Sequence, residues 1–183
     1  MKVTLVDKNI NGVNTVIEAL SLCRDKQCTE STVDHCLTAK PVPHLSALEF
    51  TWFCFLIEGV SIKTRLQQVR HRHFSSMERS TRSIDVGDSE VITPTDDLER
   101  YVTICRRLCD VATLTYPLED VAYILPLATE TKFMLAGNGR VWFDYLRQRL
   151  CKKHVQAEHY ELARELYRQL LQEIPQFKYA HLS

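Results

Sequence analysis

Phe50-Thr51-Trp52-Phe53-Cys54-Phe55-Leu56-Ile57 is the longest apolar run in the chain and the stretch that decides its fold. Glu49 and Glu58 close the run at its two ends. A helix that crosses a membrane needs ~20 apolar residues, so this run is too short to span a bilayer. Its aromatic content favours a buried strand. The sequence therefore predicts a central strand over residues 50–57 that Gly59 ends, before a helix that begins at Ser61.

On both sides of this strand the sequence shows helix and strand patterns. Residues 2–6 alternate apolar and polar side chains, which predicts a strand. Residues 73–93 are polar and irregular with a short strand near 83–86, and the periodicity of 128–136 does not decide between strand and helix. Further helices are predicted over residues 14–24, 30–38, 61–69, 95–115, 118–124, 139–151 and 155–173. The expected class is α/β (α+β), with a small mixed sheet flanked by helices.

Length and composition indicate an ordinary globular protein. The chain has 183 residues, of which 45% are hydrophobic and 25% charged, and this length suits one domain. The composition excludes a disordered, collagen-like or coiled-coil chain. The 23 basic residues balance the 23 acidic ones, which argues against a protein that coats nucleic acid through bulk charge.

The N-terminal segment and the cysteines indicate the cellular compartment of the protein. The segment 1–7 has no long apolar stretch and no small-residue cleavage site, so we expect a cytoplasmic protein without a membrane segment. The seven cysteines are odd in number and include no CxxC pair. A zinc site needs four convergent ligands, usually with such a tight pair. We therefore expect buried, reduced thiols and no metal.

A basic segment at residues 63–82 stands apart from the rest of the chain. It holds six Lys or Arg residues against one acid, Glu78, and it also carries several hydroxyl side chains. Arginine forks match phosphate oxygens in a bidentate way. A nucleic-acid surface is disfavoured because Phe74 is the only aromatic residue in the segment. Composition alone leaves a site for a phosphorylated ligand and a solvated charged face equally open.

The spacing within this segment is more specific than its composition. Arg70-His71-Arg72 followed by seven residues and Ser80 forms the pattern R-H-R-x7-S. This pattern resembles the signature of the flavin-dependent thymidylate synthases, the ThyX class. The longer set of residues that falls at family positions is Gln67, Ser75, Glu78 and Arg82.

Two other regions show the same resemblance, which extends over about residues 2–175. Residues 44–50 are similar to the family segment H-x-[ST]-P-x-E-H and depart from it at Ala47 and Phe50. Further on, Leu125-Pro126, Asn138-Gly139-Arg140, Arg149 and Gln156-Ala157-Glu158 follow the order of the family's L-P, N-x-R and R…A-Q-x-E elements. Ala122 stands where the family commonly has a nucleotide-binding arginine, and Asp144 stands where an amide is common.

The resemblance implies a complete function. It implies that residues 1–183 form a single catalytic domain that converts dUMP to dTMP. FAD would be the cofactor, methylenetetrahydrofolate would supply the carbon, and NADPH would reduce the flavin. It also implies a homotetramer with active sites at subunit interfaces. The family uses no cysteine nucleophile, which leaves all seven cysteines free to be structural.

Site residues follow from the same resemblance. Arg149 and Arg72 would be catalytic, with Arg149 facing the uracil and favouring ionisation at N3, because a nearby cation lowers the pKa of an acid. Positive charge beside the flavin would stabilise its anionic reduced form. The cofactor would bind to His44, Ser46, Arg70, His71, Arg72, Glu78, Asn138, Gly139, Arg140 and Asp144. The nucleotide would bind to Gln67, Arg70, Glu78, Arg79, Ser80, Thr81, Arg82 and Arg149.

Several alternatives stay open at this point. The departure at Ala122 leaves room for a pyrimidine nucleotide hydroxymethylase or a UMP methylase, and a non-catalytic nucleotide-binding homologue is a third reading. Arg147 rivals Arg149 on the same helix, and Asn138 is also a plausible helix cap. The residues left as surface or core histidines are His73, His154 and His159.

Overall fold

The computed structural model describes residues 1–9, 11–85, 89–151 and 153–181. Its centre is a four-stranded sheet in the order β1-β2-β4-β3. The strands are β1 (Lys2–Lys8), β2 (Trp52–Ser61), β3 (Ser75–Glu78) and β4 (Glu130–Asn138). Helices pack on one face of the sheet and lie at the two ends of the molecule, so the expected α/β class is confirmed.

The direction of the strands corrects the expectation of a mixed sheet. The pairs β1–β2, β2–β4 and β4–β3 are all antiparallel among the described residues. β2 and β3 run in the same direction, because both are antiparallel to β4. β4 lies between them, so these two strands form no parallel pair.

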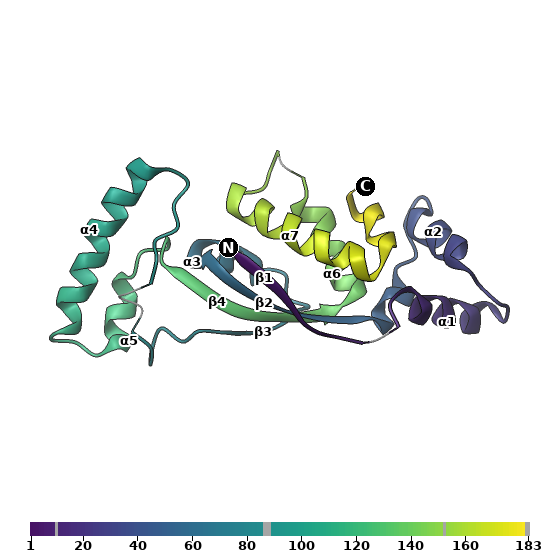
Figure 1. Ribbon diagram of the computed structural model, residues 1–183, viewed down its shortest axis with the longest axis horizontal. Helices are drawn as coiled ribbons and strands as arrows, with labels where there is room; N and C mark the ends of the chain where they lie inside the picture. Colours follow the sequence, from purple (N-terminus) through teal and green to yellow (C-terminus); the bar gives the residue numbers. More distant parts are fainter. Residues whose placement is uncertain (10, 86–88, 152, 182–183) are drawn as a thin grey trace.

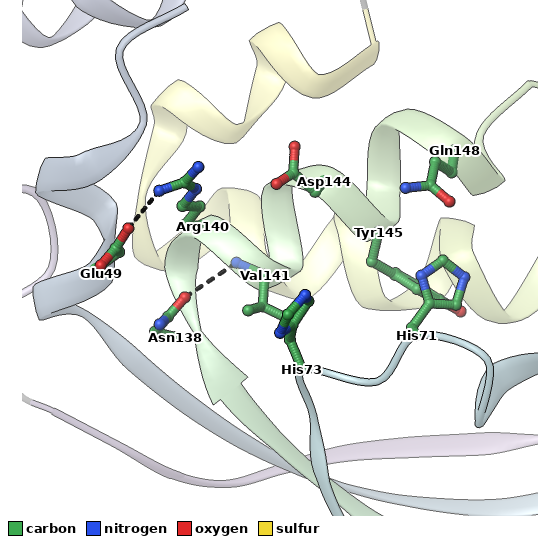
Figure 2. Close-up of a pocket in the computed structure, with 9 residues that line it drawn as sticks. All are labelled: Glu49, His71, His73, Asn138, Arg140, Val141, Asp144, Tyr145 and Gln148. Carbon is green, nitrogen blue, oxygen red and sulfur yellow. Dashed lines mark hydrogen bonds and ion pairs between the residues drawn. The ribbon is translucent and has the colours of Figure 1, made fainter.

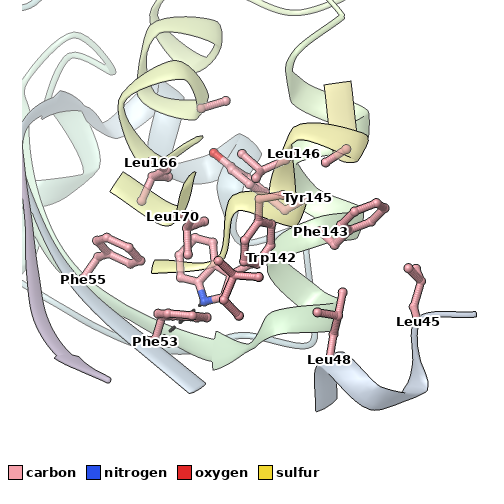
Figure 3. Packing of buried hydrophobic residues seen from close by; sticks show 14 of the residues in the cluster. Leu45, Leu48, Phe53, Phe55, Trp142, Phe143, Tyr145, Leu146, Leu166 and Leu170 are labelled. Carbon is pink, nitrogen blue, oxygen red and sulfur yellow. Dashed lines mark hydrogen bonds between the residues drawn. The ribbon is translucent and has the colours of Figure 1, made fainter. Parts of the chain in front are cut away.

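The hydrophobic core lies between one face of the sheet and two C-terminal helices, α6 (Gly139–Arg149) and α7 (Ala157–Glu173). Figure 1 shows α6 and α7 on the same side of the sheet. Figure 3 shows Trp142 of α6 among Phe53, Phe55 and Leu170. The Trp142 ring meets Phe55 edge-on at 5.0 Å, and its Nε1 donates a hydrogen bond to the Gly137 carbonyl at 3.1 Å. The apolar stripe predicted for α6 is therefore buried, as expected.

The central strand differs from its predicted bounds at both ends. Residues Ser46–Phe50 form a short 3-10 helix, η1, and Phe50 is 64% exposed. The strand begins at Trp52 and continues to Ser61 through a bulge at Gly59, whose φ of 70° suits a glycine. Ser61 caps the next helix, α3 (Ile62–Gln68), as predicted, since its hydroxyl accepts a hydrogen bond from the Thr64 amide at 3.1 Å.

The two ends of the molecule carry the remaining helices. α1 (Val13–Arg24) and α2 (Glu30–Thr38) lie at one end, and α4 (Asp96–Thr113), α5 (Leu118–Val121) and η2 (Ala122–Ile124) lie at the other (Figure 1). The chain closes with η3 (Pro175–His181). No helix in the described part of the chain combines the length and apolar character needed to cross a membrane.

α4 has an apolar stripe that the other described residues leave uncovered. The helix packs mainly against α5, and its one buried residue is Cys109. The exposed side chains recur at i, i+3, i+7 and i+10, and they are Tyr101 (65%), Ile104 (57%), Leu108 (62%) and Val111 (65%). A contiguous exposed apolar surface of this kind marks an interaction face in soluble proteins.

Candidate functional site

Many of the predicted site residues line one of two separate pockets. The first, which we call the α6 pocket, has a volume of about 570 Å³ and is lined by Glu49, His71, His73, Asn138, Arg140, Val141, Asp144, Tyr145 and Gln148. The second, the β3 pocket, has a volume of about 400 Å³ and is lined by Ile62, Arg65, Leu66, Val69, Glu78, Arg79, Ser80, Thr81, Arg82, Ala122, Leu125, Leu127 and Thr131. The R-H-R-x7-S segment contributes to both pockets.

The α6 pocket runs along α6, from Asn138 before its start to Gln148 in its last turn (Figure 2). Asn138 caps α6, because its side-chain oxygen accepts a hydrogen bond from the Val141 amide at 3.0 Å. Gly139 brings the helix close to η1, since a Cβ at this position would lie 2.9 Å from the Leu48 carbonyl oxygen of η1 and 2.2 Å from the hydroxyl of Thr51, which follows η1. Arg140 forms a 2.5 Å ion pair with Glu49, and both side chains are about half exposed. A helix start with an arginine beside it favours an anionic ligand.

His71 and Arg149 form a hydrogen-bonded pair at the edge of this pocket. Arg149 Nε donates to His71 Nε2 at 2.8 Å. Burial, together with the nearby Arg149 charge, lowers the pKa of His71 to about 4. His71 is therefore neutral at physiological pH and offers the lone pair that this bond requires. Arg147, the rival on the same helix, is exposed.

Beneath this pair lie two residues that the sequence did not identify as functional, Tyr145 and His159. The Tyr145 ring meets His71 edge-on at 4.9 Å, and its hydroxyl lies 3.0 Å from His159 Nε2. His159 is fully buried, and its Nδ1 lies 3.3 Å from Gln67 Oε1. The sequence feature that could have identified His159 is its position on the apolar stripe of α7, three residues before Leu162. A histidine buried on such a stripe must find hydrogen-bond partners.

The buried His159 predicts a pH dependence of stability. Burial and the nearby Arg149 and His71 lower the pKa of His159 to about 3, whereas an unfolded chain has a histidine pKa of ~6.5. Between these values the unfolded state binds more protons, so the free energy of unfolding falls as the pH drops below ~6.5. We expect His159 to account for a loss of about 1–2 kcal/mol between pH 7.5 and pH 5.

Urea denaturation at the two pH values checks this expectation. The matched comparison is a His159→Leu variant, which should lose less stability on acidification than the wild type, since the other titrating groups are shared. An equal loss in both proteins would show that His159 protonates at its ordinary pKa.

The β3 pocket gathers the residues predicted for the nucleotide phosphate. Ser80 Oγ accepts a hydrogen bond from the Arg82 amide at 3.2 Å, and the Arg82 guanidinium pairs with Glu119 at 2.9 Å. Both Arg82 and Glu119 are more than half exposed, so a phosphate can compete for this arginine. Arg79 instead donates to the Ser89 hydroxyl at 2.7 Å and to the Glu130 carbonyl at 2.5 Å, which ties it to the pocket wall.

A buried arginine that the sequence analysis missed supports this pocket. Arg65 donates through Nε to Glu78 at 2.6 Å, donates to the Ser76 hydroxyl at 2.9 Å, and also contacts Gln68. Its guanidinium lies over the Phe133 ring, 4.7 Å from the centroid. Glu78, predicted for both cofactor and nucleotide, lies in the β3 pocket as the partner of Arg65. Within a basic segment, Arg65 had no feature that separated it from a solvated charge.

The remaining predicted residues line neither pocket as the described residues form them; they include Gly139 and Arg149, which are described above. His44 and Ser46 are exposed before β2, and Arg70 and Arg72 are exposed after α3. Gln67 is half-buried and contacts His159. One chain alone therefore does not bring the predicted flavin residues and the predicted phosphate residues into a shared cavity.

Among the described residues, no group of three or more His, Cys, Asp or Glu side chains is arranged to hold a metal ion. Cys28 and Cys36 pack in the core, where they are 4% and 1% exposed. The Cys28 thiol thus behaves as a small apolar group, whereas Cys36 Sγ also accepts a hydrogen bond from Arg24 at 3.1 Å. The expectation of buried thiols is wrong for Cys23, Cys105 and Cys151, which are exposed.

Comparison with known proteins points to one family. A family model described as "Thymidylate synthase complementing protein" matches residues 4–176. The flavin-dependent thymidylate synthase of Mycobacterium marinum is 31% identical over 159 residues, which cover 73% of this chain and 63% of that protein. The enzyme of the same description from Mycobacteroides abscessus is 31% identical over 154 residues, covering 70% and 61%. The matched region thus spans less than two thirds of the length of these curated relatives.

Solved structures show the same fold. A crystal structure of thymidylate synthase X (ThyX) from Helicobacter pylori, described with FAD and dUMP, superposes with a TM-score of 0.87 over 99% of both chains. A second Helicobacter pylori structure gives a TM-score of 0.81 over 92% of this chain and 93% of that one. At 16% identity these likenesses establish the fold alone. The match of the family model over most of the chain confirms the predicted family: the chain belongs to the thymidylate synthase complementing protein family, the ThyX class.

Proposed function

We propose that this protein is an FAD-dependent thymidylate synthase that methylates dUMP to dTMP, with methylenetetrahydrofolate as carbon donor and NADPH as reductant. The observation that carries the proposal is the α6 pocket, where the neutral His71 of the pocket wall holds Arg149, the last residue of α6. A simple phosphate-binding protein has no need of this second, partly aromatic pocket.

The residues of the α6 pocket fit a flavin cofactor. The start of α6, Arg140 and Asn138 suit its anionic and polar parts, and Tyr145 gives the pocket an aromatic wall. Asp144 adds an acceptor, which suits an N–H donor of the ligand. When bound, the flavin would supply the redox chemistry, while the protein supplies position and electrostatics. His71 would keep the Arg149 guanidinium oriented toward the uracil, where its charge favours loss of the N3 proton.

The β3 pocket fits the phosphate of the nucleotide. Ser80, Thr81 and Arg82 line it together and would bind the phosphate, and Arg79 would hold the wall that carries them. Ala122 lines the same pocket. Compared with the arginine that is common in the family, the small Ala122 side chain leaves more space in the pocket and places no positive charge on its wall. This difference is the observation that keeps UMP as an alternative substrate.

We further propose that residues 1–183 form a single catalytic domain that works in the cytoplasm as a homotetramer, with each active site assembled from more than one copy. Two features support shared sites: the predicted flavin and phosphate residues line separate pockets of one chain, and α4 presents an unpartnered apolar stripe. The open face of the sheet also exposes apolar side chains, with Trp52 at 41%, Met77 at 76% and Met134 at 39%.

Flavin retention followed by turnover tests the proposed function. The purified chain is incubated with FAD, passed through gel filtration, and scanned for flavin absorbance with and without dUMP. We expect retained flavin, and dTMP formation once methylenetetrahydrofolate and NADPH are added. Absence of flavin under both conditions would contradict the proposal. Preference for UMP, or a hydroxymethylated product, would instead select the alternative that Ala122 suggests.

Shared active sites predict complementation between two inactive variants. Arg82→Ala should inactivate the β3 pocket, and Arg149→Ala should inactivate the α6 pocket. After subunit exchange in an equal mixture, roughly a quarter of the sites should combine two intact pockets if each site draws them from different copies. We therefore expect dTMP formation in the mixture and not in either variant alone.

The matched control mixes Arg82→Ala with Ser80→Ala, two changes in the same pocket, and should regain little activity. Mass spectrometry of the mixture would verify that subunits have exchanged. Mixed assemblies that stay inactive would show that one chain supplies both pockets to its own site.

A further inference from the structure

A largely buried polar network runs along the wall of the α6 pocket and joins three helices. Gln67 of α3 contacts His159 of α7 at 3.3 Å, and His159 contacts the hydroxyl of Tyr145 of α6 at 3.0 Å. The Tyr145 ring then meets His71 at 4.9 Å, and His71 accepts from Arg149 at 2.8 Å. Every link is therefore in contact with a residue of the proposed site.

The contacts define which atoms carry protons. With Gln67 Oε1 as the acceptor, His159 Nδ1 carries the proton, and Nε2 accepts from the Tyr145 hydroxyl. His71 Nε2 accepts from Arg149, so the His71 proton sits on Nδ1. Burial lowers the pKa of His159 and raises that of Tyr145, so both stay neutral at physiological pH.

Such a polar pair is costly to place in a hydrophobic core. His159 is fully buried and Tyr145 is 1% exposed, among neighbours such as Leu146, Leu162 and Leu166. An apolar pair of similar size would fill this space without any need for partners. The polar pair has one property that an apolar pair lacks, because it fixes the Gln67 amide and the Tyr145 ring in single orientations.

We propose that His159 and Tyr145 are positioning residues of the active site. His159 orients Gln67 toward the nucleotide, and Tyr145 supports the His71 ring that holds Arg149. This inference rests on the proposed function and deepens it, since it gives both residues a role that acts through Gln67, His71 and Arg149, a role separate from the place of Tyr145 in the pocket wall.

The test uses Tyr145→Phe, His159→Leu and the double variant. Each single change leaves a buried polar group without its partner, so both single variants should melt at lower temperature than the wild type. The double variant removes both polar groups and should regain most of that stability. We expect its kcat/KM for dUMP to stay at least ~10-fold below the wild type, about 1.4 kcal/mol by the rate relation. Tyr160→Phe is the control that should keep normal activity, because Tyr160 lies on α7 beside His159 but outside this polar network.

Histidine-ring nitrogen NMR provides a second measurement that does not depend on activity. In the wild type His71 should show the Nδ1–H tautomer alone, and in the double variant it should exchange between two tautomers. A double variant with wild-type stability, wild-type kcat/KM and an unchanged His71 spectrum would overturn the inference. If the wild type itself forms no dTMP, the proposed function fails. The His71 tautomer alone then decides whether Tyr145 and His159 position the His71 ring.

Discussion

Arg149→Lys is expected to lower turnover of dUMP by ~100-fold while flavin content stays near normal. The Nε–H group of Arg149 already donates a hydrogen bond to His71. The two terminal amino groups of its guanidinium have no hydrogen-bond partner among the described residues and remain available for the nucleotide. Lysine keeps the charge but lacks the planar fork, so one ammonium group cannot bind His71 and the nucleotide at the same time. The loss of a hydrogen bond to a charged group costs ~1.5–3 kcal/mol, and ~2.7 kcal/mol corresponds to the predicted change.

The natural control for this experiment is Arg147→Lys. Arg147 lies on the same helix and is exposed, so its replacement should leave kcat unchanged. Single-turnover kinetics on flavin-loaded protein would separate the chemical step from binding. If a folded Arg149→Lys protein turned over at the wild-type rate and Arg147→Lys did not, the two arginines would exchange their assignments.

Helical periodicity explains why the α6 stripe was predictable from the sequence. Trp142, Tyr145 and Leu146 recur at helical spacing, and burying that face is the only way to remove them from water. Arg149 continues the stripe and therefore had to lie at the edge of the core. The caps Ser61 and Asn138 were predictable for a similarly local reason, since each side chain bonds the amide three residues ahead.

The short strand β3 could not be predicted in the same way. Residues Ser75–Glu78 are exposed along their whole length, so no alternation of buried and exposed positions marks them. Their strand conformation comes from pairing with β4, more than 50 residues away along the chain. The predicted strand near 83–86 was wrong for residues 83–85, which lie in turn and irregular structure, and residue 86 lies outside the described part.

The division of the site into two pockets was also beyond the sequence. Arg70 to Ser80 forms one compact motif along the chain, yet β3 carries its two ends apart, so that His71 reaches the α6 pocket and Ser80 the β3 pocket. Partners of buried polar groups are likewise set by tertiary contacts. His159 and Arg65 each find theirs on other elements, and their residue types alone do not distinguish a buried group from a solvated one.

Arg65 is the residue that attaches β3 to the body of the protein. Its side chain is 7% exposed and bonds to Glu78 and Ser76 of β3, and the same guanidinium lies on Phe133 of β4. Glu78 directly precedes the segment that carries Ser80 and Arg82 of the β3 pocket. Since Glu78 is 48% exposed, water can solvate its carboxylate when Arg65 is removed. The loss of folding stability therefore comes mainly from the buried partners of Arg65.

Arg65→Met is therefore expected to lower stability by about 3 kcal/mol, because one buried cationic partner is removed and Gln68 is left buried with fewer hydrogen bonds. For a chain of this length such a loss corresponds to a melting temperature lower by ~6–12 °C. With β3 less firmly held, dUMP affinity should fall by ~10-fold, whereas flavin retention should change less, since the α6 pocket is separate. Thermal unfolding and dUMP calorimetry measure the two effects, and Lys63→Met, an exposed change on the same helix, is the control. A stable Arg65→Met protein with normal dUMP affinity would mean that β3 is held by its pairing with β4 alone.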